Sequence, residues 1–374
     1  MDKKVKKTGK FRRFALRLLG PSVSKMLIYR LLRKKINKAP ALLPGGLSRC
    51  SDILFILPAD RVEMIYQLEN LFCILGRYRD SNLTFVCPTA SVPFVSGLKG
   101  VRMVKFDPDE FKLFSAEFNS VTQALATKSF DICVMLEKKH TLAHLYIAGM
   151  SHAHIRVGWD ADPVSSFPFL NIRLFSTQRE GVTLWERNLE VAKILDADAD
   201  SKVRWGVPKS TAEEVAQLLG EHKLKRDPAL ICVDAASLED AHGKEWCAEL
   251  MKNLKGAIPG QFYVFGGIDG EKNVKTDAPF PVLPPTSIPK TAALMACTDL
   301  VITGAGPLLG LAQISGSRIA AAVTKEQAEA YCKKNERIVP VTVSGKPGGT
   351  ESAAMIRAAK EMIAHCKRGS SQPS

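Results

Sequence analysis

Short apolar runs alternate with amphipathic stretches along most of the chain. The first run, Ile53 to Leu57, is followed by apolar residues at helical spacing from Val62 to Leu75. Further apolar runs occupy 83–86, 101–106 and 132–136, with helix-like stretches between them. Buried strands that alternate with crossover helices are typical of a parallel sheet. We therefore predict an α/β domain in this part of the chain.

The same pattern is repeated in the second half of the chain. An amphipathic helix is predicted at 183–195, and the charged, proline-containing stretch after it is expected to be a linker. The predicted elements that follow are 211–219, 229–233, 246–254, 262–265, 287–297, 300–302, 319–323 and 351–366. Two similar α/β halves joined by a short linker place a ligand in the cleft between them. The predicted organisation is an N-terminal arm (1–50), a first α/β domain (51–205), a second α/β domain (206–366) and a tail (367–374).

A glycine-rich turn follows the predicted strand at 300–302. It consists of Thr303, Gly304, Ala305, Gly306 and Pro307, and a helix-like stretch comes next. In an open parallel sheet such a turn lies at the carboxyl edge, where ligands bind, and the amides that open the next helix suit a diphosphate. Many turns of this composition bind nothing, so the turn alone leaves both interpretations open.

Charged residues also follow the first predicted strand. Asp60, Arg61 and Glu63 are expected at the carboxyl edge of the first sheet. A carboxylate there can act as a general base toward a hydroxyl group. Acidic residues in the first turn of a helix are also favoured by the helix dipole without any catalytic role, so both interpretations stay open.

The composition limits the kinds of chemical site that we expect in this protein. The 374 residues are 46% hydrophobic and 24% charged, as in ordinary globular proteins. Nine cysteines form no CxxC pair, which favours buried thiols in a reducing compartment over disulfides or a zinc site. His140 and His144 are four residues apart, but no HExxH pattern accompanies them, which favours polar positions on an amphipathic helix. We expect no metal and no cofactor other than the substrates.

The net charge of +14 is concentrated in residues 1–38, which hold fourteen Lys or Arg residues and one acidic residue. Apolar residues from Phe11 to Leu19 fall on one side of a predicted helix, and the cations of this arm include Lys10, Arg12, Arg13, Arg17, Arg33, Lys34 and Lys35. No run is long enough to span a bilayer. The pattern favours an interfacial helix on an anionic membrane, while a solvated tail and a helix packed on the body stay open. Nucleic acid is not expected.

Four stretches resemble the heptosyltransferase-type glycosyltransferases of family 9. FDICVMLEKKHTLAHLYIAG with HIRVGWD is similar to the family's yDlvidlq…r…riGfd, and LWERNLEVAKILDAD is similar to its h.verxlxllxxlg helix. ALICVDAAS with EWCAELMKNL resembles ivlhpga…W.eLa..L. TSIPKTAALMACTDLVITGAGPLLGLAQISGS resembles tslxelaaliaxadlvvtnDTGpmHlAaAlgkP, so the likeness extends over most of residues 50–365.

The resemblance implies a GT-B fold, in which a Rossmann-like acceptor domain faces a Rossmann-like donor domain across a cleft. It implies inverting transfer of heptose or a similar sugar from an ADP-linked nucleotide sugar to a lipid-linked, lipopolysaccharide-type glycan. Such an enzyme would be cytoplasmic and peripheral on the inner membrane face. Glu63 falls on the family's catalytic aspartate, and Asp60 and Arg61 would lie on the acceptor side. The expected donor-binding residues are Ser237, Lys244, Asp269, Glu271, Thr303, Gly304, Ala305, Gly306 and Pro307.

The donor motif departs from the family pattern. Gly304, Ala305 and Leu309 stand at its Asp, Thr and His positions, and the basic residue after "pga" falls on Glu239 unless a gap supplies Lys244. A missing charge-assisted contact typically costs about 1.5–3 kcal/mol, so several losses together weaken binding strongly. Two hypotheses therefore stand: an active glycosyltransferase, and an inactive GT-B homologue that binds a glycan, a lipid or a protein.

Overall fold

The computed structural model describes residues 50–98, 100–111, 115–139, 141–160, 169–175, 182–197, 208–225, 227, 229–269, 278–333, 335–343 and 349–369, together with residues 30, 36 and 47. The predicted membrane-facing cations of the arm, Lys10 to Lys35, lie outside these residues, as do His140 and Glu271. None of the helices in the described part has the length and hydropathy needed to cross a lipid bilayer.

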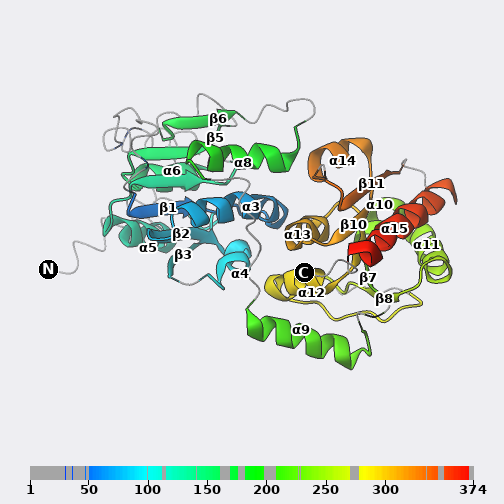
Figure 1. Cartoon of the computed structure of the whole chain (residues 1–374). Helices are drawn as coiled ribbons and strands as arrows, with labels where there is room; N and C mark the ends of the chain where they lie inside the picture. Colours follow the sequence, from blue (N-terminus) through cyan, green and yellow to red (C-terminus); the bar gives the residue numbers. More distant parts are fainter. Residues whose placement is uncertain are drawn as a thin grey trace.

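The first lobe is built on a six-stranded parallel sheet with the strand order β3-β2-β1-β4-β5-β6 (Figure 1). Its strands are β1 (Asp52–Ile56), β2 (Asn82–Pro88), β3 (Val101–Phe106), β4 (Ile132–Met135), β5 (Ile155–Asp160) and β6 (Ile172–Phe175). The order reverses between β1 and β4, which pair directly with Ile53 opposite Ile132. Ligands of open α/β sheets bind at the carboxyl ends of the strands that flank such a switch point.

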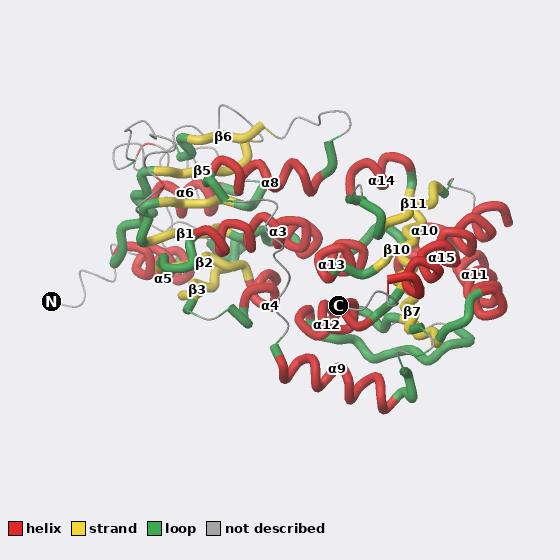
Figure 2. Tube along the Cα trace, in the orientation of Figure 1, coloured by secondary structure: helices red, strands yellow, loops and turns green. Residues whose placement is uncertain are grey.

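Helices cover both faces of this sheet because its strands are apolar on both sides (Figure 2). Ile53 and Phe55 share a core with α3 and α8, whereas Leu54 and Ile56 share a separate core with α5 and α6. The helices of this lobe are α3 (Arg61–Arg77), α4 (Val92–Val95), α5 (Ala116–Ala126), α6 (Leu142–Met150) and α8 (Leu184–Ile194).

The second lobe contains a five-stranded parallel sheet with the order β11-β10-β9-β7-β8. Its strands are β7 (Leu230–Val233), β8 (Gln261–Val264), β9 (Leu300–Thr303), β10 (Arg318–Val323) and β11 (Ile338–Thr342). Here the order reverses between β7 and β9, which also pair directly. The carboxyl ends of β7 and β9 therefore mark a second switch point.

The helices of the second lobe are α9 (Lys209–Glu221), α10 (Ala235–His242), α11 (Lys244–Ala257), α12 (Ile288–Cys297), α13 (Pro307–Ser315), α14 (Lys325–Tyr331) and α15 (Gly349–Gly369). Residues of α10, α11 and α15 form the core on one face of the sheet, and residues of α12 and α13 form the core on the other. The eight cysteines whose side chains are described are free thiols, and six of them are buried.

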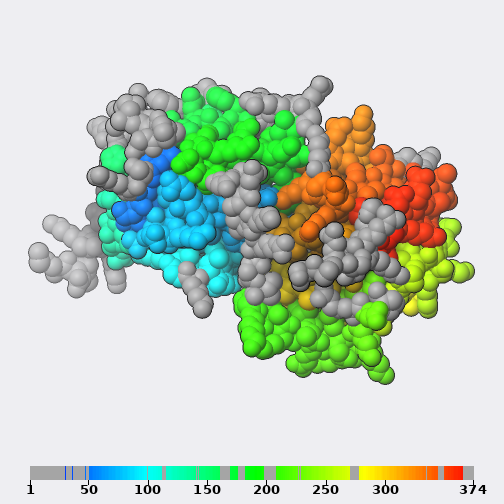
Figure 3. Space-filling model, in the orientation of Figure 1, coloured from blue at the N-terminus to red at the C-terminus, as the bar shows by residue number. Residues whose placement is uncertain are grey.

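The two lobes are in direct contact through apolar side chains. Figure 1 shows α3 of the first lobe beside α13 of the second, and Figure 3 shows the two lobes side by side. One hydrophobic cluster runs from β1 through α3 to Leu308, Leu309 and Leu311 of α13. A Cβ on Gly310 would overlap Cγ2 of Ile65, so glycine is what allows the two helices to approach this closely.

Most predicted elements are confirmed, with ends displaced by one to three residues. The strand predicted at 300–302 is β9, and the helix predicted at 183–195 is α8. The amphipathic pattern does not reveal β6, β11, α10 or α14, which are four to eight residues long. The strands β6 and β11 lack a continuous buried apolar run, and the helices α10 and α14 are too short for a clear helical period.

Candidate active site at the junction of the lobes

Asp60 fixes the corner between β1 and α3. Its Oδ1 atom accepts the backbone N–H of Glu63 at 2.9 Å, so Asp60 is the N-cap of α3. This bond satisfies one of the amides that a helix leaves unpaired at its start. The helix-cap interpretation therefore accounts for Asp60, and the cap holds Glu63 in the first turn at the β1 side of the switch point.

The carboxylate of Glu63 points toward the exit of β4. Its Oε1 atom accepts the backbone N–H of Lys138 at 3.1 Å. Next to it, the buried carboxylate of Glu137 accepts the N–H of Ala59 at 3.0 Å and the N–H of Lys139 at 2.8 Å. Two carboxylates from the neighbouring strand ends β1 and β4 thus meet at the first switch point.

Burial and charge change the acidity of this cluster. Burial of the Glu63 carboxyl and the negative charge of Glu137 raise the pKa of Glu63 to about 7, against the opposing effect of Lys138. Burial also lowers the pKa of Lys138 to about 8, and the positive charge of Arg187 acts in the same direction while Glu63 opposes it. A carboxylate whose pKa is near 7 is well matched to accepting a proton at neutral pH.

Two further side chains of α8 and β5 border the cluster. The ammonium of Lys138 lies 5.1 Å from the centre of the Trp159 ring, within the range of a cation–π contact. Arg187 Nε and Trp159 Nε1 are buried and have no hydrogen-bond partner among the described residues. Buried N–H groups usually have a hydrogen-bond partner, so we expect these two to donate to a bound ligand or to water.

The glycine turn of the second lobe is held in place by the start of α10, which follows β7. Thr303 Oγ1 donates to Asp234 Oδ2 at 2.8 Å, and Gly304 N–H donates to Ser237 Oγ at 2.9 Å. A Cβ on Gly304 would lie 3.0 Å from the carbonyl oxygen of Ser237, so a larger residue would force the turn outward. Ser237 and Thr303 therefore shape the turn, and the N–H of Gly304 is already used.

The front of the turn offers backbone amides to a ligand. Ala305, Gly306 and Pro307 are partly exposed, whereas Leu309, at the family's histidine position, is fully buried. Gly306 has no side chain to cap α13, and Pro307 has no N–H. The amides that remain for an anion are those of residues 305, 306, 308 and 309, at the positive end of the α13 dipole.

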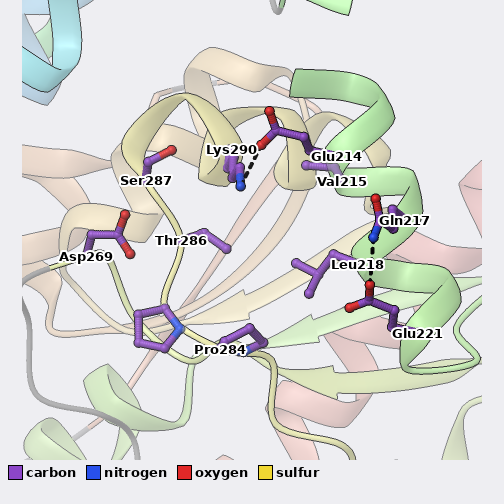
Figure 4. A pocket seen from close by; sticks show the side chains of 11 residues that line it. Glu214, Val215, Gln217, Leu218, Glu221, Asp269, Pro284, Thr286, Ser287 and Lys290 are labelled. Carbon is purple, nitrogen blue, oxygen red and sulfur yellow. Dashed lines mark hydrogen bonds and ion pairs between the residues drawn. The ribbon is translucent and has the colours of Figure 1, made fainter. Parts of the chain in front are cut away.

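A cavity of about 330 Å³ lies beside the carboxyl end of β8 (Figure 4). A Cβ on Gly266 would overlap the carbonyl oxygen of Leu283, and Gly267 has a φ of +107°, so this strand exit requires glycine at both positions. The exit leads to Asp269, whose backbone N–H donates to Thr286 O at 3.0 Å. In Figure 4, Asp269, Thr286 and Ser287 face Glu214, Gln217, Leu218 and Glu221 of α9 across the cavity.

Lys244 belongs to a different helix from the serine that contacts the glycine turn. Ser237 lies in the first turn of α10, whereas Lys244 begins α11 after the chain has turned at Gly243. The exposed Lys244 lines a different hollow of about 490 Å³, together with His242, Trp246, Glu249 and Gly349. Glu239, the ungapped match, is partly buried on α10.

The contact between α3 and α13 brings the two switch points together. Glu63 precedes Ile65 by two residues, and Pro307 precedes Gly310 by three, so both lie within roughly 5 Å of helical rise of the contact. A second link across the lobes is Arg61, whose Nη1 lies 3.5 Å from the carbonyl oxygen of Asp269. The carboxylate cluster, the glycine turn and the rim of the cavity therefore belong to one junction.

Comparison with solved structures identifies the architecture. A glycosyltransferase family 9 protein from Veillonella parvula superposes with a TM-score of 0.67 at 15% identity, covering 84% of this chain and 97% of that one. The Escherichia coli ADP-heptose lipopolysaccharide heptosyltransferase II gives 0.62 at 14% identity, covering 84% and 99%. An E. coli heptosyltransferase solved with ADP gives 0.56 at 17% identity, with the same coverage.

The chain has a GT-B fold. The fold that the sequence resemblance implies is thereby confirmed, over most of the chain and almost the whole of each compared structure. Protein-family models and curated protein sequences yield no match to this chain. At these identities the likeness shows the architecture alone.

Sequence reasoning does not single out Glu137, Lys138, Arg187 or Asp234. Three of them nevertheless have a positional signal, because Glu137 and Lys138 follow the apolar run at 132–136 and Asp234 follows the run at 229–233. Polar residues at such strand ends face the ligand side of a parallel sheet. Arg187 has no comparable signal, because it lies within a helix that is amphipathic for packing reasons alone.

Proposed function

We propose that this chain is an inverting glycosyltransferase of the heptosyltransferase type. The observation that carries the proposal is the position of Glu63, a carboxylate with a pKa of about 7 at the switch point of one lobe. It lies near the partly exposed start of α13 at the switch point of the other lobe. A base and an anion site that face one junction are the two components that sugar transfer from a nucleotide diphosphate requires.

The donor in this proposal is a nucleotide sugar, with an ADP-linked heptose or a similar sugar as the first candidate. Its nucleoside would occupy the cavity beside Asp269, which supplies a carboxylate for ribose hydroxyls. Its diphosphate would lie on the amides of residues 305, 306, 308 and 309. Since the strand order is β9-β7-β8, the strand before the turn and the strand before Asp269 are roughly 10 Å apart. Lys244 can contribute only if its long side chain reaches past α10.

The reaction is a single displacement. The acceptor hydroxyl loses its proton to Glu63, and its oxygen forms a bond to the anomeric carbon of the donor. The bond between that carbon and the diphosphate oxygen breaks, and the electron pair leaves with the nucleoside diphosphate. The amides at the start of α13 stabilise the charge that develops on this leaving group.

No group of three or more His, Cys, Asp or Glu residues in the described part could hold a metal ion.

The acceptor in this proposal is a lipid-linked glycan of the lipopolysaccharide type, which would approach from the side of Lys138 and Trp159. The basic arm would hold the protein on the inner membrane face, in the cytoplasm, where such an acceptor is assembled. An arm with Phe and Leu on one side and fourteen cations over residues 1–38 suits an anionic lipid surface.

A second candidate is a non-catalytic GT-B protein that binds a glycan, a lipid or a partner protein. It is favoured by the loss of side-chain ligands at the glycine turn, where Gly304, Ala305 and Leu309 stand. The retained carboxylate at Glu63 and its raised pKa favour the enzyme.

The deciding experiment combines binding and turnover. Calorimetric titration with ADP, UDP and GDP tests the donor site, and incubation with ADP-heptose and other nucleotide sugars plus membrane glycolipid tests transfer. Glu63→Gln should lower turnover by about 10²- to 10⁴-fold, while Glu63→Asp keeps a carboxylate and should retain part of the rate. Turnover that is undiminished in Glu63→Gln excludes this base, and absence of both binding and turnover favours the second candidate.

A further inference from the structure

Glu137 and Lys138 lie beside Glu63 but have no part in the displacement described above. Glu137 is 4% exposed, and each of its carboxylate oxygens accepts a backbone N–H. The two donors, Ala59 and Lys139, lie at the exits of β1 and β4. The position of this negative charge next to Glu63 is therefore fixed by the sheet itself.

Lys138 places a positive charge near Glu63, and its effect on Glu63 opposes that of Glu137. Its backbone N–H donates to Glu63, and the ammonium of its half-buried side chain lies over the Trp159 ring. The charged groups that act on Glu63 are Asp60 on its own helix and Glu137 and Lys138 at the exit of β4. Arg187 of α8 acts on the cluster through Lys138.

We propose that Glu137 and Lys138 are positioning residues that set the charge of Glu63 with opposite sign. Lys138 favours the ionised carboxylate that must be present before the reaction. Glu137 favours the protonated form that the reaction produces, because protonation of Glu63 removes the repulsion between the two carboxylates. The role in catalysis rests on the function proposed above, whereas the electrostatic effect on Glu63 does not.

The two charges should change the acidity of Glu63 in opposite directions, which residues that serve packing alone would not do. Removal of the Glu137 charge makes Glu63 a stronger acid, and removal of the Lys138 charge makes it a weaker one. Because the three charges meet in a partly buried site, where water screens them weakly, midpoint shifts of about one pH unit or more are expected. Loss of packing would not produce shifts of opposite direction.

The test is a pH titration of the Glu63 side chain by NMR, with ¹³C-glutamate-labelled full-length protein. The Glu63 carboxyl signal is assigned by its loss in Glu63→Gln. Its midpoint should fall in Glu137→Gln and rise in Lys138→Gln. Lys139→Gln is the matched control, because Lys139 is the next residue, its side chain is exposed and only its backbone N–H contacts the cluster.

Midpoints that stay unchanged in both variants, or that move in the same direction, overturn the proposal. Glu137→Gln leaves one backbone N–H without an oxygen acceptor, so its fold is checked by circular dichroism. If it does not fold, Lys138→Gln and Lys138→Met decide the question, since a rise of the Glu63 midpoint in both supports the proposal and no rise rejects it. Where turnover is measurable, the acid limb of the rate profile should move with the NMR midpoint. Opposite shifts without any turnover would uphold the electrostatic assignment and reject the enzyme.

Discussion

Ile65 of α3 and Gly310 of α13 meet at the contact between the two lobes, where a single added methyl group on Gly310 would overlap the Ile65 side chain. Ile65 and its neighbour Tyr66 are buried, and residues on both sides of the contact belong to one hydrophobic cluster. The relative position of the two switch points depends on this contact, because Glu63 and Pro307 are each within one turn of it.

Gly310→Ala is expected to destabilise the protein by about 1–3 kcal/mol, because overpacking forces a shift of the facing helix. Chemical denaturation measures the free energy of unfolding. The control is Gly256→Ala in α11, where nothing lies within 4 Å of the added Cβ. Alanine there should stabilise by up to about 1 kcal/mol through helix propensity. Equal effects of the two substitutions would contradict the close approach of α3 and α13.

Glu63→Gln is expected to stabilise the protein at pH 8, even though it removes the proposed base. The folded-state pKa of Glu63, about 7, lies above its usual value of 4.5, so the folded state disfavours the ionised carboxylate. The stabilisation that protonated Glu63 gives to the folded state is complete below pH 4.5, and it is lost as the pH rises through 7. The gain at pH 8 should be on the order of 2 kcal/mol, and should disappear near pH 4. A gain that is the same at both pH values would refute the raised pKa.

Lys333 joins the lobes at a further point, away from the α3–α13 contact and the Arg61 link. Its ammonium lies 2.6 Å from the Glu69 carboxylate and 4.4 Å from the centre of the Trp185 ring. Because both charges are about three-quarters buried, with exposed side-chain fractions of 22% and 24%, Lys333→Gln should cost about 1–3 kcal/mol in denaturation experiments. Lys209→Gln removes an exposed ion pair within the second lobe and should change stability by less than about 1 kcal/mol. Equal costs for the two would show that the Lys333 contact stabilises the protein no more than an exposed ion pair does.

The arm is expected to bind anionic membranes through charge. Deletion of residues 1–40 should release the protein from vesicles that contain phosphatidylglycerol, as measured by co-sedimentation at low salt. Binding of the intact chain should weaken as salt rises, because the Debye length shortens to about 10 Å at 0.1 M. Neutral vesicles are the control. An intact chain that fails to bind anionic vesicles at low salt would refute the membrane interpretation.

Sequence patterns predict most of the two sheets and both proposed halves of the site. The apolar run from Ile53 to Leu57 and the run before Thr303 identify β1 and β9, since a buried strand needs only a short stretch of apolar residues. Because the carboxyl ends of parallel strands share an edge, the positions of Glu63 and of the glycine turn along the chain already suggest a ligand edge.

Strand order and side-chain neighbours were decided only by the tertiary structure. The pairing of β1 with β4 and of β7 with β9 sets the two switch points, and no local pattern encodes which strands become neighbours. The same pairing places Glu137 and Lys138 beside Glu63, although 74 residues or more separate them along the chain. The acidity of Glu63 and the meeting of Ile65 with Gly310 depend on distances between remote segments. Those distances exist only after the chain has packed, whereas the alternation of apolar and polar residues is present in the sequence itself.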